Sequence, residues 1–522
     1  MLEVIKMCGM FMEEIIFCGD DVLVYNFDDR VKIFYPPDPI PPLEDPDRAV
    51  LDAIRSPIGS KPISELVDAA SNVVIAFDDM CVPLPQSRKK DPRAIAARAV
   101  VAELENAGVK KENITFICAR GLHRRCKPQE LRMILGSDIV KEFKDRILHH
   151  NPTDPGNLVK IGETPSGHVV EINKVAAEAD LLIYLNITFT PMNGGWKSFI
   201  IGLGSYSTIR ASHIPEVTGK GHLMDPERSM LHKIIWEMGQ VLKERVNVFT
   251  VESVVNNDFY SGLLGRLWRP LKGQSSRIRK ILLKLMGKSP KFLKRIVRRK
   301  YRANYAPIGF FAGDPEEAHK ETLKLVEKQM LVRVDQQFDV VIFGLPNLCP
   351  YSVGTELNPV LLHTTIFGYL VNMYKGKPPL KRGGVLVVAN PAEKVFDLEQ
   401  HPSYAELYYK ILPNITKMED LENYEKEFLE REDLMQKFVQ RYAYHPIHAI
   451  IAYYWGAMGR KHAGRTIIAG AKSEDVLKRL GLEDAKDLDD AIRKAKEYAG
   501  EDASIAYLFM PPLFIADLSA SI

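Results

Sequence analysis

The sequence predicts an α/β protein with two parallel-sheet domains, and three observations support this fold class. Short apolar runs alternate with helical patterns along most of the chain, as in folds built on parallel sheets. One run, Asn72 to Phe77, is continuous and rich in β-branched residues, which is typical of a strand buried on both faces. The length of 522 residues exceeds what one hydrophobic core normally supports, so two domains are expected.

The first half of the chain contains strands and helices that alternate. The expected strands are Asp21 to Tyr25, Val31 to Tyr35, Asn72 to Phe77, Asn113 to Ala119, Ile147 to Asn151, Leu181 to Leu185 and Val246 to Val255. The expected helices are Pro46 to Arg55, Asp91 to Ala107 and Pro226 to Glu244. Several of the strands lead directly into polar loops.

The second half shows the same alternation. A helix from Pro315 to Gln329 precedes strands at Phe338 to Phe343, Gly384 to Ala389, Thr466 to Ala471 and Ser504 to Phe509. We therefore divide the chain into an N-terminal domain (1–256), a helical insertion (257–306) and a C-terminal α/β domain (307–522). The active site is expected in the cleft between the two α/β domains.

The composition is that of a globular protein, with 46% hydrophobic and 26% charged residues. The six cysteines form no Cys-x-x-Cys pair, which argues against a zinc ribbon or a disulfide framework and suits a reducing compartment. The N-terminus lacks the pattern of a signal peptide, and the longest apolar stretch, Ala449 to Met458, is too short to span a bilayer. We expect a soluble, cytoplasmic protein.

Two strand ends in the first half carry groups that can do chemistry. Open α/β sheets bind their ligands at the carboxyl ends of strands, and Asp78 and Asp79 stand at such a position. The alternative is that they cap a turn or a helix. His123 follows the next strand and can act as a general base near neutral pH, although a single histidine is often structural. Nearby arginines, Arg124 among them, can hold a carboxylate or phosphate.

A glycine loop follows the strand that ends at Leu185. Gly194 and Gly195 remove side chains where the backbone approaches a ligand or turns sharply. Lys197 beside them can serve as a charge on phosphate or as an amine nucleophile, and His213 stands sixteen residues further on. The residues alone indicate a cofactor or anion site. The alternative is a glycine-rich turn with a solvated lysine.

The pattern Gly-Gly-x-Lys, with a histidine sixteen residues later, resembles the nickel-pincer lactate racemase superfamily. The resemblance implies that Lys197 is joined covalently to a nickel-pincer nucleotide, a pyridinium bis-thiocarboxylate mononucleotide that carries nickel. It also implies that His213 is the protein ligand of nickel, whose remaining donors come from the cofactor. His123 matches a catalytic histidine of the family, with Asp79 beside it in the site. Arg124 and His150 are candidates for holding the cofactor.

Other segments extend this resemblance over nearly the whole chain, except the insertion. Ser56 to Gly59 resembles the opening segment of the family, and Val159 to Val175 resembles its hairpin. Pro307 to Asp314 matches a Gly-x-Phe-Ala-Gly-Asp segment at the start of the second half.

Three positions depart from the family pattern. A second catalytic histidine lies ten residues before the cofactor lysine in the family, and that position here is Ile187. The family's substrate-holding arginine falls on Val82, and a family lysine falls near Glu356. The group that serves the opposite face of the substrate is therefore open; the candidates are Thr188, Asp79, His150, and Tyr351 with Ser352.

We therefore predict a nickel-pincer-dependent racemase or epimerase of a small 2-hydroxy acid other than lactate. Such a reaction passes a hydride from the substrate carbon and back while a histidine takes the hydroxyl proton. The alternative is a non-catalytic homologue that binds the cofactor or another ligand. A Schiff base between Lys197 and pyridoxal phosphate is a third hypothesis, but no other supporting site accompanies it.

The insertion is strongly basic. Residues 261–302 contain fifteen Lys or Arg and no Asp or Glu, and removing them from a net charge of +3 leaves −12 for the rest. Ile278, Ile281, Leu282 and Leu285 are spaced as on one helix face, and Ser289-Pro290 begins a second helix. Such helices suit an anionic membrane surface or an acidic partner. The alternative is a hairpin packed on the body with its charges solvated. Nucleic acid is not expected as a partner, because few aromatic residues interleave the charges.

Overall fold

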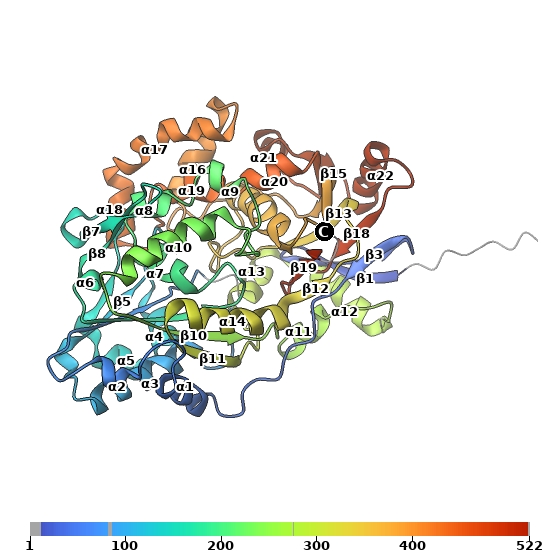
Figure 1. Ribbon diagram of the computed structural model, residues 1–522. Coiled ribbons are helices and arrows are strands. Elements are labelled where there is room, and N and C mark those ends of the chain that lie inside the picture. Colours follow the sequence, from blue (N-terminus) through green and yellow to red (C-terminus); the bar gives the residue numbers. More distant parts are fainter. Residues whose placement is uncertain (1–11, 82–85, 275, 520–522) are drawn as a thin grey trace, which may run out of the picture.

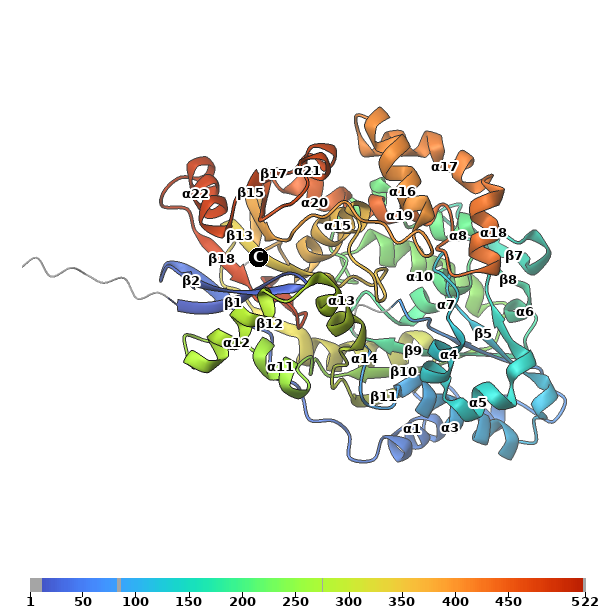
Figure 2. The same cartoon turned by 180° about the vertical axis from the view of Figure 1, so that it is seen from behind.

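The computed structural model describes residues 12–81, 86–274 and 276–519, and Figures 1 and 2 show it from opposite sides. Two large sheets, one of six strands and one of eight, are built mainly from parallel neighbours with helices between them. This arrangement confirms the predicted α/β class. We call the parts around the six-stranded and eight-stranded sheets the first lobe and the second lobe.

The first-lobe sheet has the strand order β11-β10-β9-β4-β5-β6. Its strands are β4 (Val73–Phe77), β5 (Ile114–Cys118), β6 (Ile147–His149), β9 (Leu181–Thr188), β10 (Val248–Val255) and β11 (Pro307–Gly313). All neighbours are parallel except the β10–β11 pair. The chain leaves β4 to build β5 and β6 on one side and later returns to build β9 on the other. The carboxyl end of β4 is therefore the switch point at which α/β sheets bind ligands.

Helices cover both faces of this sheet. The first face packs on α1 (Pro46–Arg55), α2 (Ile63–Leu66), α3 (Pro92–Asn106), α4 (Pro128–Leu135) and α5 (Ser137–Glu142). The second face packs on α6 (Lys174–Ala177), α7 (Gly195–Leu203), α10 (Met230–Lys243) and α14 (Pro315–Met330). Helices α1, α3 and α14 each begin with an Asp-Pro pair, in which the aspartate accepts backbone N–H groups and proline occupies the first turn.

Short elements complete the first lobe. A hairpin of β7 (Leu158–Glu163) and β8 (Val169–Asn173) lies before α6, as the sequence predicted. Two short helices, α8 (Tyr206–Arg210) and α9 (Pro215–Thr218), follow α7.

The second-lobe sheet has the order β17-β16-β15-β13-β1-β2, with β18 paired to both β13 and β3. Its strands are β1 (Met12–Gly19), β2 (Asp21–Phe27), β3 (Val31–Phe34), β13 (Phe338–Pro346), β15 (Leu380–Ala389), β16 (Arg465–Ala469), β17 (Glu483–Ala485) and β18 (Ile505–Leu508). A small sheet of β12 (Leu331–Arg333), β14 (Tyr374–Lys375) and β19 (Ile515–Asp517) lies beside it.

The strand pairing corrects the predicted boundaries 1–256 and 307–522. Strands β1 to β3 belong to the second-lobe sheet, because Ile15, Ile16 and Phe17 pack there against its buried residues. Conversely, β11 is the edge strand of the first-lobe sheet, so the first lobe continues to about Met330. Alternating strand patterns identify a strand but not its partner, which explains the error.

The helices of the second lobe are mostly short. They are α15 (Pro359–His363), α16 (Pro402–Glu406), α17 (Glu422–Leu429), α18 (Glu432–Gln440), α19 (His448–Tyr454), α20 (Ala457–His462), α21 (Glu474–Leu480) and α22 (Leu488–Ala499). Two π-helical segments, Thr364–Tyr369 and Leu407–Ile411, extend α15 and α16.

The predicted helical insertion is present as α11 (Gly262–Trp268), α12 (Arg277–Gly287) and α13 (Lys291–Lys300). Figure 2 shows it beside β1 and β2. Trp268 packs against the rings of Phe17 and Tyr301, at centroid distances of 6.4 and 4.7 Å. The insertion is therefore joined to the body by an aromatic cluster.

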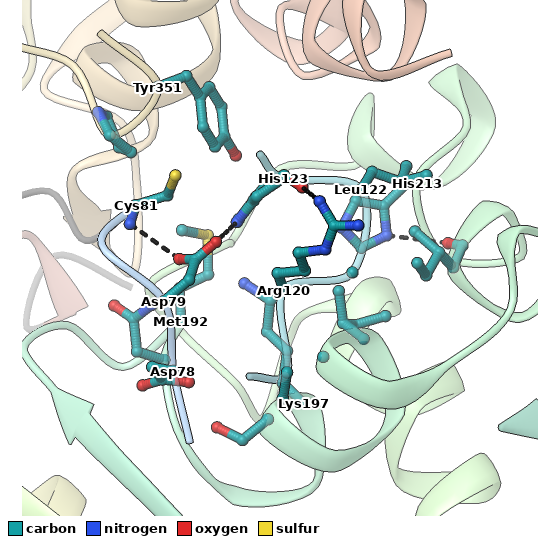
Figure 3. Close-up of a pocket in the computed structure, with 18 of the residues that line it drawn as sticks. Asp78, Asp79, Cys81, Arg120, Leu122, His123, Met192, Lys197, His213 and Tyr351 are labelled. Atoms are coloured by element: carbon teal, nitrogen blue, oxygen red, sulfur yellow. Dashed lines mark hydrogen bonds and ion pairs between the residues drawn. The ribbon is translucent and has the colours of Figure 1, made fainter. Parts of the chain in front are cut away.

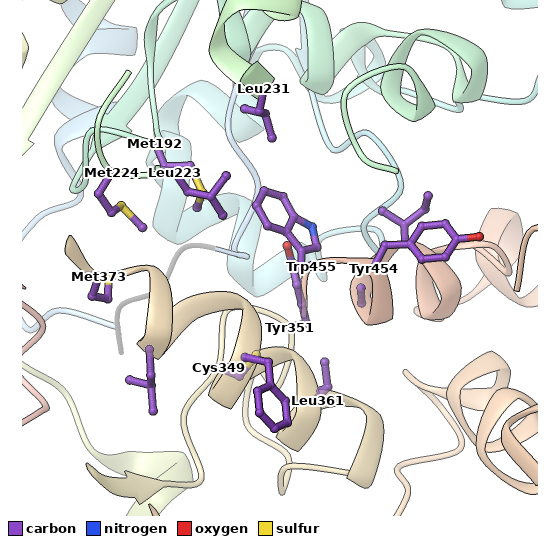
Figure 4. Close-up of a cluster of buried hydrophobic side chains, with 14 of the residues drawn as sticks. Met192, Leu223, Met224, Leu231, Cys349, Tyr351, Leu361, Met373, Tyr454 and Trp455 are labelled. Carbon is purple, nitrogen blue, oxygen red and sulfur yellow. The ribbon is translucent and has the colours of Figure 1, made fainter. Parts of the chain in front are cut away.

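One large hydrophobic cluster crosses from lobe to lobe. Figure 4 shows its central part, where Met192 and Leu223 of the first lobe lie near Cys349 and Trp455 of the second. A shared core of this kind holds the two lobes together. Among the residues that the structure describes, no helix is both long and apolar enough to cross a membrane.

Candidate active site

The carboxyl ends of three neighbouring strands deliver polar residues to one cavity. Asp78 and Asp79 follow β4, His123 follows β5, and Lys197 lies in the first turn of α7 after β9. Figure 3 shows these side chains around a common cavity. The volume of the cavity is about 970 Å³, including its opening to solvent. The second lobe closes this cavity with Tyr351, Tyr369, His448 and Trp455. The cavity therefore lies between the lobes, at the switch point of the first-lobe sheet.

Asp79 and His123 form a hydrogen-bonded pair. The Nδ1 atom of His123 lies 3.0 Å from Oδ2 of Asp79, and the amide of Cys81 donates to Oδ1 at 2.8 Å. Burial alone would raise the pKa of Asp79, but the charge and hydrogen bond of His123 lower it below the ordinary value. The ionised carboxylate accepts the Nδ1–H of His123, which leaves Nε2 as the basic nitrogen.

Two buried arginines brace these strand ends. Arg93 donates to the carbonyl oxygens of Asp78 and Asp79, each at 2.7 Å, and pairs with Asp91. Arg120 donates to the carbonyl oxygens of His150 and His123, at 2.7 and 3.1 Å. Because both guanidinium groups bind backbone, the loops that carry the Asp79–His123 pair are held rigidly.

Lys197 is a half-buried amine on the wall of the cavity. Its Nζ lies 5.6 Å from the centre of the Trp455 ring. Burial lowers the pKa of Lys197 to about 8, against a partial opposing effect of the Asp78 charge. A substantial fraction of the amine is therefore neutral near pH 8, which is the form that acts as a nucleophile.

His213 is held in one orientation. Its Nδ1 lies 3.0 Å from the carbonyl oxygen of Ile209 and 2.9 Å from Oγ of Ser212. Burial, with the charge of Lys197, lowers the pKa of His213 to about 3, so the ring is neutral. Since Nδ1–H donates to the carbonyl, Nε2 keeps a free lone pair, as a metal-binding histidine requires. Ile209 is thus the acceptor that fixes the tautomer.

The paired glycines allow the loop to pack closely, and one of them also borders the cavity. Gly194 and Gly195 have φ of +88° and +54°, and a Cβ would lie 2.5 Å from Oγ1 of Thr188 and 2.8 Å from Cδ2 of His319, respectively. The buried carboxylate of Glu252 accepts the Gly195 N–H at 2.7 Å and contacts Nδ1 of His319 at 2.8 Å. Only Gly194 of the pair lines the cavity. Together these contacts fix the start of α7, and with it Lys197.

Arg124 and His150, predicted to hold the cofactor, do not line the cavity. Arg124 makes a buried bidentate pair with Glu130, at 2.7 and 2.9 Å. His150 lies 2.9 Å from the carbonyl oxygen of Gly204 through Nε2 and 3.3 Å from the amide of Asn173 through Nδ1. Both side chains are committed to these partners, so their contacts contradict the prediction.

The departures from the family pattern also have positions in the fold. Ile187 lies in a neighbouring hollow with Arg93 and Tyr305. Glu356 pairs with Arg295 and Arg298 of the insertion, at 2.8 and 2.9 Å, and does not line the cavity. Val82 lies outside the described residues. Thr188 is buried and donates to Glu252 at 3.2 Å, so it does not face the cavity either.

The aromatic wall of the second lobe went largely unpredicted. Tyr351 and Tyr369 share a hydrogen bond of 2.7 Å between their hydroxyl groups. The ring of His448 lies 5.2 Å from that of His123 and 4.6 Å from that of Tyr351. The sequence contains a signal for this wall, because two histidines and several aromatic residues stand close together between Tyr444 and Trp455. The apolar stretch from Ala449 to Met458 does not by itself indicate a cavity wall.

Cys81 adds a third polar atom beside the Asp79–His123 pair. Asp79, Cys81 and His123 offer potential metal ligands that lie within 4.8 Å of one another. Burial raises the pKa of the Cys81 thiol well above its ordinary value, and its Sγ lies 3.0 Å from the Tyr444 hydroxyl. In the metal-free protein the thiol is therefore protonated and can donate a hydrogen bond within this cluster.

The fold and cavity define a two-lobe α/β protein with a lysine amine, a neutral imidazole and an Asp–His pair in one interlobe site. Comparison with known proteins agrees with this class. The lactate racemase N-terminal domain model matches residues 20–222. Curated lactate racemases of Lactiplantibacillus plantarum and Thermoanaerobacterium thermosaccharolyticum are 36% and 32% identical over 168 residues. The match spans 31% of this chain and 37% of each relative.

Solved structures show the same fold over nearly the whole chain. The lactate racemase apoprotein of Thermoanaerobacterium thermosaccharolyticum aligns with a TM-score of 0.64 and 20% identity, covering 98% of this chain and 99% of that one. A protein of Thermotoga maritima aligns with a TM-score of 0.51 and 14% identity, covering 93% and 100%. Residues 20–222 therefore resemble the N-terminal domain of lactate racemases, and the whole chain shares the fold of the lactate racemase apoprotein.

Proposed function

We propose that the protein is a racemase or epimerase of a small 2-hydroxy acid that works with a nickel-pincer nucleotide. One observation carries this proposal: the amine of Lys197 and the imidazole of His213 line one cavity together with the Asp79–His123 pair, and both lie near the ring of Trp455, at 5.6 and 5.2 Å. A partly neutral amine suits covalent attachment, and a neutral imidazole with a fixed Nδ1–H suits a nickel ligand. The residues present therefore fit this cofactor.

The cofactor, when bound, supplies an acceptor that takes a hydride from the substrate carbon and returns it. The chain's own residues move the proton. His123, oriented by Asp79, takes the hydroxyl proton of the substrate through Nε2 and returns it to the transient ketone oxygen. The resulting imidazolium is stabilised by the ionised Asp79 carboxylate.

We assign the second proton-transfer group to His448. Ile187, at the position of the family's second histidine, has no proton to give, whereas His448 lines the same cavity from the second lobe. Burial, with the charge of nearby His123, keeps the pKa of His448 well below its ordinary value, so the ring is neutral. The Tyr404 hydroxyl lies 2.5 Å from its Nδ1, which fixes the ring with Nε2 as the available nitrogen.

Intact mass and metal analysis of protein produced together with the cofactor-forming enzymes tests the proposal. We expect a covalent mass increase that disappears in Lys197→Ala, and bound nickel that falls sharply in His213→Ala. Lys233→Ala, which changes an exposed lysine on α10, is the matched control and should retain both. Wild-type protein that stays unmodified and free of nickel would overturn the proposal in favour of a non-catalytic binding homologue.

Activity is then assayed by following loss of optical purity in a panel of single-enantiomer 2-hydroxy acids. Loaded wild-type protein should racemise or epimerise at least one of them, and unloaded protein should not.

A further inference from the structure

The insertion presents an unusual number of apolar side chains to solvent. Of the twenty large hydrophobic side chains that are exposed in the described residues, eight belong to α11, α12 and α13. They are Leu263, Ile278, Ile281, Leu282, Leu285, Phe292, Leu293 and Ile296. We call this set the insertion patch. A helix of a soluble domain normally turns its apolar face toward the core, so the orientation requires an explanation.

Helix α13 packs on the body through its charged face. Arg298 pairs with Asp20 at 2.6 Å and with Glu356 at 2.9 Å, and Lys294 pairs with Asp21. The Lys294 and Arg298 side chains are only 15% and 13% exposed, whereas Phe292 is 61% exposed. The second lobe therefore holds α13 by its cations and leaves its apolar face outward.

Helix α12 is attached in a similar way. Leu283 is its one buried residue, and Lys280 pairs with Glu13 of β1 at 2.6 Å. Arg279 donates to the carbonyl oxygen of Leu267 at 3.0 Å. These contacts leave Ile278 and Ile281 exposed by 71% and 53%.

The charge around the patch identifies the kind of surface that covers it. Residues 261–302 contain no acidic residue. Arg277, Lys284, Lys288 and Lys300 are exposed, and within the described part of the chain no carboxylate pairs with them. Exposed aliphatic side chains and exposed cations on the same short helices match an anionic bilayer, whose headgroups neutralise the cations while its acyl region takes the aliphatic side chains.

A second copy of the chain is a poor alternative. A symmetric contact would place the same basic segment of two molecules face to face, with no acidic residue from either segment to compensate. We propose that the insertion patch is a docking surface for an anionic lipid bilayer. The proposal is independent of the chemistry in the cavity and stands if the protein has no catalytic activity.

Co-sedimentation of the full-length protein with vesicles tests the proposal. We expect binding to vesicles of phosphatidylcholine with phosphatidylglycerol, weak binding to phosphatidylcholine alone, and release by high salt. Ile281→Glu with Leu285→Glu should abolish binding. Lys284→Gln with Lys288→Gln should weaken it about 25-fold, since each basic residue near the surface contributes about fivefold. Leu398→Glu, at an apolar residue that is 63% exposed outside the insertion, is the matched control and should bind normally.

A second readout does not depend on loss of binding. Phe292→Trp places a fluorophore in the patch, and its emission should shift to the blue with anionic vesicles but not with neutral ones. Three outcomes would overturn the proposal. The first is that the wild type does not bind anionic vesicles at low salt. The second is that the wild type self-associates and that Ile281→Glu abolishes this association. The third is that the patch variants bind vesicles as well as the wild type does. If the insertion patch binds an acidic protein stably but does not bind vesicles, its partner is a protein and not a lipid surface.

Discussion

The two walls of the cavity differ in chemistry and in origin. The first-lobe wall carries the ionisable groups Asp79, His123, Lys197 and His213, all placed by strand ends of one sheet and by the helices that follow them. The second-lobe wall is mainly aromatic, with Tyr351, Tyr369 and Trp455, and its ionisable group is His448. The lactate racemase N-terminal domain match covers the first wall alone. If the proposed function holds, the first wall would carry the reaction, and the second wall would adapt the site to its substrate.

The largest expected effect is on the first wall. His123→Ala should lower the turnover of the loaded enzyme by about 10⁴-fold, because the general base that takes the hydroxyl proton is removed. Asp79→Asn should lower turnover less, because Nε2 of His123 is still present although the imidazole has lost its charged partner at Nδ1. Steady-state kinetics measure both, and His168→Ala, in the β7–β8 hairpin and not among the residues that line the cavity, is the control. Full activity in His123→Ala would show that the first wall does not carry the proton transfer.

The next effect is on stability and concerns the buried Arg124–Glu130 ion pair beside the first wall. Arg124→Met leaves Glu130 as an unpaired buried carboxylate, and breaking such a pair typically costs about 3–5 kcal/mol. Urea unfolding should show this loss, while nickel content and covalent loading stay unchanged in the protein that remains folded. Arg132→Met, an exposed arginine on α4, should be nearly neutral. Loss of cofactor without loss of stability would restore Arg124 as a cofactor-binding residue.

A smaller effect is expected on the second wall. His448→Asn should lower kcat by about 10²-fold, at the low end for an acid–base group, with little change in KM. Tyr404→Phe removes the hydroxyl that fixes the ring and should give a partial loss. If His448 only shapes the pocket, KM will change instead and kcat will be retained. That result would mean that only the first wall takes part in proton transfer, and that the second wall only shapes the substrate pocket.

The smallest expected effect comes from the lowered pKa of Lys197. The pKa of Lys197 is lowered to about 8 by burial, so the apoprotein should show one lysine that reductive methylation modifies with a midpoint near that pH. The folded protein binds this proton less tightly than the unfolded chain does. Its stability should therefore rise with pH from about 8 to the ordinary lysine value of about 10.4. Lys197→Met should remove this part of the pH dependence, and an unchanged slope would contradict the assignment.

The sequence predicted those parts of the site that depend on local order. A buried strand followed by polar residues placed Asp79, His123 and Lys197 at one sheet edge, because parallel strands end together. Contacts between distant segments were not accessible in this way. Glu130 is a helix residue six positions after Arg124, yet no pattern indicated that it takes that guanidinium out of the site. His448 reaches the cavity through packing of the lobes, which a periodic pattern does not encode.

The insertion illustrates the same limit. Helical spacing in Ile278 to Leu285 predicted an amphipathic helix correctly, but periodicity does not state which face meets the body. The acidic residues that orient the insertion are Glu13 for α12, and Asp20, Asp21 and Glu356 for α13, and all of them lie far from it in sequence.

The path of the chain also determines how the lobes can move. It leaves the second lobe after β3, crosses to α13 between β10 and β11, and returns finally after α14. The lobes are thus joined by several chain connections and not by a single linker. This connectivity disfavours a wide hinge opening of the cavity between them. The first lobe is contiguous in sequence from about residue 36 to residue 330, apart from the insertion that packs on the second lobe, whereas the second lobe is assembled from two segments that lie far apart in the sequence.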